Sequence, residues 1–95
     1  MVDATVANHS GAAISLLEVD YPSASFGTQN LLPGAEFHYR FKVLGSGVVK
    51  LTYTDSGQHE HASTGPMLHE GAEGLLTVTL DPADVRWQTT LKQKP

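Results

Sequence analysis

Histidines in the second half of the chain are the residues whose types and spacing could do chemistry. His59 and His61 flank Glu60, and on an extended strand this spacing places both imidazoles on one face, roughly 6.5 to 7 Å apart. Imidazoles at that separation can share one zinc or copper ion. The pattern therefore marks His59 and His61 as candidate metal ligands.

Further ligands for such an ion would have to come from the flanks of this segment. His69 lies eight residues beyond His61, and Asp55 lies at the other end of the segment, so either could be a third ligand. The alternative interpretation is an exposed edge strand, in which polar side chains deter edge-to-edge pairing. His9 and His38 fit plain surface positions. A polar edge strand is therefore the first interpretation of His59 and His61, and a metal site is the second.

The chain lacks the usual signatures of catalysis. There is no Gly-x-Ser-x-Gly nucleophile elbow, and the nearest string, Leu44-Gly45-Ser46-Gly47, fits a loop between strands. No glycine cluster leads into a helix that could bind phosphate. Paired carboxylates for glycoside hydrolysis would need a deep cleft, which small sandwiches seldom provide. We therefore expect no enzymatic activity and no cofactor.

Aromatic side chains could instead stack on sugar rings. Trp87 is the sole tryptophan and lies between Arg86 and Gln88, where it could form an exposed platform. A lone tryptophan in a domain of this size is more often a core anchor. A carbohydrate-binding module is accordingly the third hypothesis.

Charge restricts the class of partner. Ten acidic residues against six Lys and Arg give a net charge of −4, which argues against nucleic acid as a ligand. Residues 55–84 contain six acids and no Lys or Arg. That segment could meet a cation or a basic partner, or it could simply be an acidic, solvated end of the domain.

Length and composition predict one small folded domain, residues 1–95. The chain is 40% hydrophobic, which is too apolar for disorder, and 95 residues suffice for one core. It has no cysteine, so neither disulfides nor thiolate metal sites are expected. No apolar run approaches the roughly 18 residues of a membrane span. Residues 1–4 lack the features of a secretory signal, so the sequence fits a cytoplasmic protein and, if a signal was trimmed, an exported or periplasmic one equally.

Short alternating segments predict strands throughout the chain. Gly and Pro leave no interruption-free stretch longer than twelve residues, so helices have little room. Residues 36–43 alternate Phe37, Tyr39, Phe41 and Val43 with polar residues, and residues 48–54 repeat the pattern. The short connection between them predicts an antiparallel hairpin.

Six other segments complete the prediction. Strands are expected over residues 5–8, 13–21 and 75–80, with an edge strand over 59–64 and either an edge strand or a strand switch near 25–28. Pro33-Gly34 predicts a type II turn. Residues 81–84 fit one helical turn with Asp81 as its cap, followed by a strand over Val85–Lys92, although a helix through Trp87 and Leu91 is the alternative.

These features together predict an all-β fold, an antiparallel immunoglobulin-like β-sandwich of about seven strands. The chain resembles the immunoglobulin-like and fibronectin-III-like modules of bacterial envelope and secreted proteins. The resemblance rests on architectural motifs that span most of the chain: Val6-x-Asn8, Ile14-x-x-x-Glu18-Val19, Leu32-Pro33-Gly34 and Phe37-x-Tyr39-x-Phe41.

The function expected from this reading is a non-catalytic binding or structural module. Its partner would be another protein in a larger assembly or in a parent chain, and it would bind through a strand edge or the loops at one end, with residues 55–84 holding that surface. The runner-up is a small metal-binding protein that uses His59 and His61.

Overall fold

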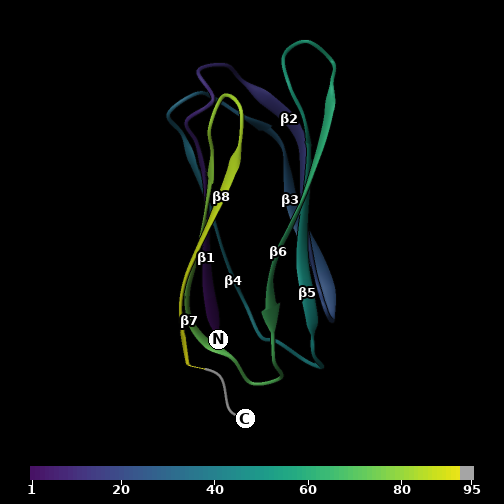
Figure 1. The fold of residues 1–95 in the computed structure, drawn as a ribbon, viewed down its shortest axis with the longest axis vertical. Coiled ribbons are helices and arrows are strands. Elements are labelled where there is room, and N and C mark those ends of the chain that lie inside the picture. Colours follow the sequence, from purple (N-terminus) through teal and green to yellow (C-terminus); the bar gives the residue numbers. More distant parts are fainter. Residues whose placement is uncertain (93–95) are drawn as a thin grey trace.

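Two four-stranded β-sheets packed face to face form the structure, a computed structural model that describes residues 1–92 (Figure 1). The predicted domain range also includes residues 93–95, which lie outside the described residues. The strands are β1 Val2–Asn8, β2 Ile14–Tyr21, β3 Ala24–Leu31, β4 Glu36–Phe41, β5 Gly47–Thr54, β6 Glu60–Leu68, β7 Glu73–Leu80 and β8 Val85–Lys92. The all-β sandwich is therefore confirmed, with eight strands in place of the predicted seven.

The strand order is β4-β1-β7-β8 in one sheet and β3-β2-β5-β6 in the other. All neighbours are antiparallel except β1 and β7, which run parallel, so the first sheet is mixed. The immunoglobulin fold places its first, second, fifth and fourth strands in one sheet. Here β1 pairs with β4 and β7, while β2 pairs with β3 and β5. The resemblance thus holds for two packed sheets but not for their strand order.

The predicted hairpin of residues 36–43 and 48–54 is wrong. β4 and β5 belong to different sheets, and the connection 42–46 passes from one sheet to the other. Val43 within this connection is buried at 1% exposure and helps to close the core. Alternation correctly indicates which face of a strand is apolar, but it does not say which strand pairs with its edge.

The core lies between the sheets and is filled by the alternating side chains. Its largest fully buried members include Val6 and Val78 from one sheet and Val19 and Leu51 from the other. Phe41 is buried as expected, whereas Phe37 is half-buried and Tyr39 is 41% exposed. β4 is an edge strand, so its inward side chains reach the border of the core and some stay accessible.

The last connection differs from its prediction. Asp81 and Asp84 exchange backbone hydrogen bonds of 2.9 and 3.4 Å, which makes 81–84 a tight hairpin turn and not a helical turn. The strand over Val85–Lys92 is confirmed and pairs with β7 along its whole length. The type II turn is confirmed as well, since the Ala35 amide donates to Leu32 O at 3.0 Å and Gly34 has φ of 81°.

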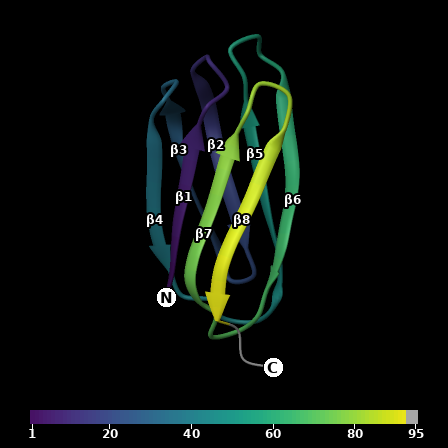
Figure 2. The same cartoon turned by 60° about the vertical axis from the view of Figure 1, so that its left-hand side comes forward.

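Four connections gather at one end of the sandwich, and we refer to this end as the loop end. They are 9–13, 32–35, 55–59 and 81–84, and they lie opposite the N-terminus (Figure 2).

In residues 1–92 the structure contains no helix long and apolar enough to cross a membrane.

Asn8 ties the loop end together and is fully buried. Its Nδ2 donates to Ala12 O and to Leu31 O, both at 2.9 Å, and its Oδ1 accepts from the Ser10 amide and hydroxyl. Since β1 and β3 lie in different sheets, one side chain joins the two layers and fixes the turn between β1 and β2.

Candidate functional site

The β5–β6 connection is organised by the carboxylate of Asp55. Its Oδ1 accepts hydrogen bonds from the amides of Gly57 at 2.8 Å and His59 at 3.0 Å. Gln58 adopts φ of 67°, and its amide donates to Asp55 O at 3.1 Å. Asp followed by Ser-Gly favours such a turn because the short carboxylate can reach amides two and four residues on.

Both candidate histidines converge on this carboxylate. His61 Nε2 lies 2.7 Å from Asp55 Oδ2, and His59 Nδ1 lies 3.5 Å from Asp55 Oδ1. An ionised carboxylate only accepts, so Nε2 of His61 carries the proton in this bond. The His61 ring also stacks on Tyr53, with centroids 4.9 Å apart and planes 15° apart. The ring is therefore held at one edge and on one face.

These contacts set the ionisation of the site. The His61 hydrogen bond, followed by the His59 amide, lowers the pKa of Asp55 from 3.8 to about 2. Burial, and then the negative charge of Asp55, raise the pKa of Tyr53 above its ordinary value. Asp55 is consequently an anion, and Tyr53 a neutral phenol, at neutral pH.

The predicted third ligand does not join the pair. His69 follows the last residue of β6, whereas His61 is the second residue of that nine-residue strand. At about 3.3 Å per residue the two histidines are separated by most of the length of the sandwich. Within residues 1–92, no three His, Cys, Asp or Glu side chains are grouped so that they could hold a metal ion. Asp55, the other residue predicted as a further ligand, does contact both His59 and His61.

Two small hollows flank this arrangement and share Tyr53, His61 and Pro82 in their walls. One has about 230 Å³ and extends toward Ser63 and Val85, and the other has about 220 Å³ and extends toward Ser10. Pockets for small molecules usually measure roughly 300 to 1,000 Å³. The hollows are thus of a size for single side chains of a partner.

The acidic segment 55–84 is divided between the two ends of the sandwich. β6 carries the chain away from the loop end and β7 brings it back. Asp55, Glu60, Asp81 and Asp84 lie at or next to the loop end, and Glu70 and Glu73 lie at the opposite end. The predicted single acidic surface is wrong because a strand of this length spans the molecule. At the loop end, Asp81 forms an ion pair with Arg86.

Trp87 closes the side of the sandwich where β6 and β8 meet. Its Nε1 donates to Ser63 Oγ at 2.9 Å, and its half-buried ring packs against the core. A Cβ placed on Gly65 would come within 2.6 Å of that ring, so the indole lies directly on the Gly65 backbone. This supports the core-anchor interpretation of Trp87, since both its N–H and part of its ring are already used.

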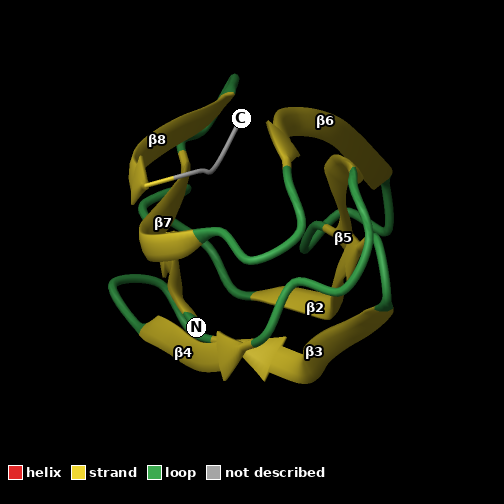
Figure 3. Ribbon diagram, turned by 90° about the horizontal axis from the view of Figure 1, so that it is seen from below, coloured by secondary structure: helices red, strands yellow, loops and turns green. Residues whose placement is uncertain are grey.

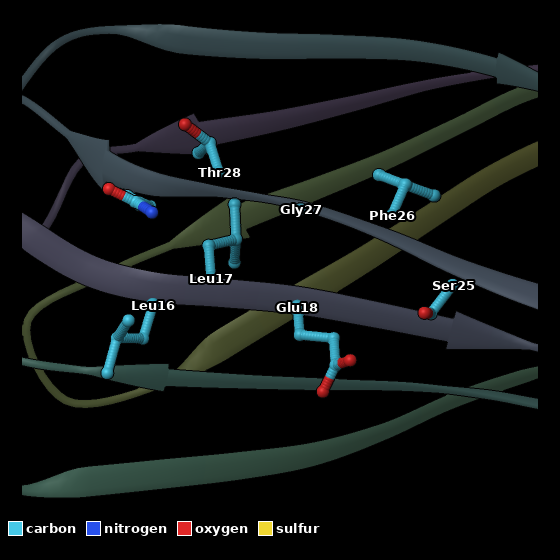
Figure 4. Close-up of a pocket in the computed structure, with 8 residues that line it drawn as sticks. Leu16, Leu17, Glu18, Ser25, Phe26, Gly27 and Thr28 are labelled. Atoms are coloured by element: carbon cyan, nitrogen blue, oxygen red, sulfur yellow. The ribbon is translucent and has the colours of Figure 1, made fainter.

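A wide, open groove of about 530 Å³ on β2 and β3 was not predicted from the sequence. Figure 4 shows its lining, where Gly27 contributes no side chain between neighbours from the two strands. A Cβ on Gly27 would overlap the Leu17 carbonyl oxygen. Leu16 has φ of 53° at a break in the β2–β5 register and is 65% exposed. The doublet Leu16-Leu17, which interrupts the alternation, was the available signal for this bulge.

Comparison of the chain with protein-family models, with curated proteins and with solved structures finds no significant match.

Proposed function

We propose that this chain is a non-catalytic binding module that contacts a partner protein through its loop end. The observation that carries the proposal is the fixed ring of His61, held by Asp55 at its edge and by Tyr53 on its face, between two side-chain-sized hollows. Binding sites gain affinity when their contact groups are already ordered in the free protein.

Charge at this surface favours a basic partner. The Asp55 carboxylate is ionised at neutral pH, and Asp81 lines the same hollow. Asp84 lines the neighbouring hollow. A Lys or Arg side chain that entered either hollow would meet a carboxylate and the Tyr53–His61 ring pair, which suits a cation.

Within residues 1–92 no nucleophile is hydrogen-bonded to the His61 ring, which supports a binding role over hydrolysis. A nucleophilic triad needs a hydroxyl or thiol bonded to a base that a third group orients. Asp55 orients His61, but the nearby Ser63 hydroxyl is bonded to Trp87. Within residues 1–92 no serine or threonine hydroxyl forms a hydrogen bond with the His61 ring.

The proposal is tested by titrating the labelled protein with a short Lys- and Arg-rich peptide and following amide resonances. Shifts should concentrate in residues 55–61 and 81–84, and Asp55→Asn should reduce them. Glu73→Gln, at the opposite end, is the matched control and should leave them unchanged. The proposal is wrong if the shifts are spread over the surface, if an acidic peptide of equal length produces the same shifts, or if no shifts occur.

His59 and His61 both contact the Asp55 carboxylate, but within residues 1–92 these side chains are not grouped as a three-ligand metal site, so the metal hypothesis stays a second prediction. Titration with micromolar zinc and with copper(II) tests it, with His9 and His69 as internal controls. If the His59 and His61 resonances do not move, this second function is rejected.

A further inference from the structure

The hydroxyl of Tyr53 is a polar group on a buried side chain that the fold leaves without a partner. Tyr53 is only 6% exposed, and within residues 1–92 its Oη forms no hydrogen bond. No side-chain N or O atom of the described residues is both sealed from solvent and unpaired. The Tyr53 hydroxyl therefore reaches the surface, where Tyr53 lines the two hollows of the loop end. A buried polar side chain that is still unpaired marks a place where a ligand atom can complete its hydrogen bonding.

Asp84 supplies a second open acceptor, and it lines only one of these hollows. Its Oδ1 accepts from the Val85 amide at 2.8 Å, whereas its Oδ2 has no partner among residues 1–92. We call the hollow that extends toward Ser63 and Val85 the Asp84 hollow. Its walls contain no Lys or Arg. An anionic oxygen and a phenol oxygen thus line one space of about 230 Å³ with no lysine or arginine beside them.

The carboxylates of the neighbouring hollow are already engaged. Asp55 Oδ1 accepts from two backbone amides, and Asp55 Oδ2 is bonded to His61. Both oxygens of Asp81 accept from Arg86. A cation in that hollow would share acceptors that other donors hold, whereas in the Asp84 hollow it would meet a free one.

The Asp84 hollow also has an aromatic wall. The stacked rings of Tyr53 and His61 line it, and Asp55 holds the His61 ring at its edge. β6 and β8 lie on the same side of the sandwich, away from β3 and β4, and the hollow includes residues of both strands (Figure 3). Planar cations stack favourably on such rings.

We propose that the Asp84 hollow receives the guanidinium group of an arginine side chain of the partner protein. The inference rests on the proposed function, because it names the side chain that a partner inserts at the loop end. A guanidinium is planar and carries five N–H donors in a fixed fork, so it offers donors to Asp84 Oδ2 and Tyr53 Oη and a face to the rings. A lysine ammonium is a compact, strongly hydrated charge without such a face. Arginine should therefore be preferred over lysine.

Two peptides that differ only in their cations test this inference. One is the basic peptide with arginine at every basic position, and the other has lysine at the same positions. Amide resonances of the labelled protein give a dissociation constant for each peptide. The arginine peptide should bind about tenfold more tightly, and its shifts should include residues 61–63 and 82–85.

Variants of the two open acceptors locate the guanidinium. Tyr53→Phe removes the hydroxyl but keeps a ring that stacks on His61, and it should weaken binding of the arginine peptide about tenfold. Tyr39→Phe makes the same change on β4 and is the matched control, which should bind as the wild type does. Asp84→Asn keeps an acceptor for the Val85 amide and should also weaken binding of the arginine peptide.

The outcomes separate this inference from the proposed function. Equal affinities of the two peptides would overturn the inference and leave the proposed function standing, whereas binding of neither peptide would overturn both. A preference for arginine that persists in Tyr53→Phe and in Asp84→Asn would reject the Asp84 hollow as its site. If Tyr53→Phe does not fold, Asp84→Asn decides, because Asp84 is exposed in a turn.

Discussion

The indole Nε1 of Trp87 donates to Ser63 Oγ across a distance of 2.9 Å, and this bond joins the two sheets at the side where β6 and β8 meet. The opposite side is closed by stacked rings, among them Phe26 and Tyr39. The sandwich is thus fastened by a polar contact along one border and by aromatic contacts along the other. The Trp87 contact also holds the edge strand β8 against β6.

Replacing Gly65 with alanine should disturb this contact. A Cβ at Gly65 would lie 2.6 Å from the Trp87 ring, which cannot move without losing the Ser63 bond. We expect Gly65→Ala to cost about 1 to 3 kcal/mol of unfolding free energy in urea denaturation. Gly47→Ala is the control, because its Cβ would meet Pro22 at an ordinary 3.5 Å. Equal stability of the two variants would mean that Trp87 does not rest on Gly65.

At the aromatic border, the effects of replacing Phe41 and its neighbour Lys42 on stability can be compared. Phe41 is 3% exposed, and its ring centroid lies 4.1 Å from that of Tyr21, whereas Lys42 is exposed. Phe41→Ala should cost about 3 to 5 kcal/mol, and Lys42→Ala should be nearly silent. Similar costs in chemical denaturation would show that the inward face of β4 has been misassigned.

Asn8 should be one of the polar residues whose replacement most reduces the unfolding free energy. Asn8→Ala would remove the side-chain donor to Leu31 O and the acceptor of the Ser10 amide, while Ala12 O would keep its hydrogen bond from Ser10 Oγ. Each buried polar group left unsatisfied costs about 1 to 3 kcal/mol. We expect a loss of at least about 2 kcal/mol and faster hydrogen exchange in the loop end. Asn30→Ala removes an exposed amide and serves as the control. A loss no larger than that of the control would contradict the role of Asn8.

Stability in acid should depend on Asp55. Its pKa falls from 3.8 to about 2 on folding, chiefly through the His61 hydrogen bond, so the folded state favours the charged carboxylate. The stability that this carboxylate contributes is present above about pH 4 and is lost as the pH falls toward about 2. The difference in unfolding free energy between wild type and Asp55→Asn should therefore shrink over that range. A difference that stays constant, or an Asp55 carboxyl carbon that titrates near pH 4, would refute the assignment.

The sequence by itself determined where most strands lie and which of their faces are apolar. The alternation of residues 48–54 and 75–80 is a local property, because successive side chains of a strand point to opposite sides whatever the strand pairs with. The turn at Pro33-Gly34 and the polar edge strand near His61 were also predictable, since both depend on residues adjacent in the chain.

Only the tertiary structure decided which strands pair and which side chains meet. The 42–46 connection could have formed a hairpin, but burial of Val43 carries the chain into the other sheet. Asp55 was expected only as one more ligand for a metal, whereas folding makes its carboxylate the acceptor for His61. Trp87 and Gly65 lie on strands of different sheets, so no spacing in the sequence relates them. Such contacts depend on long-range packing of the two sheets, which local periodicity does not encode.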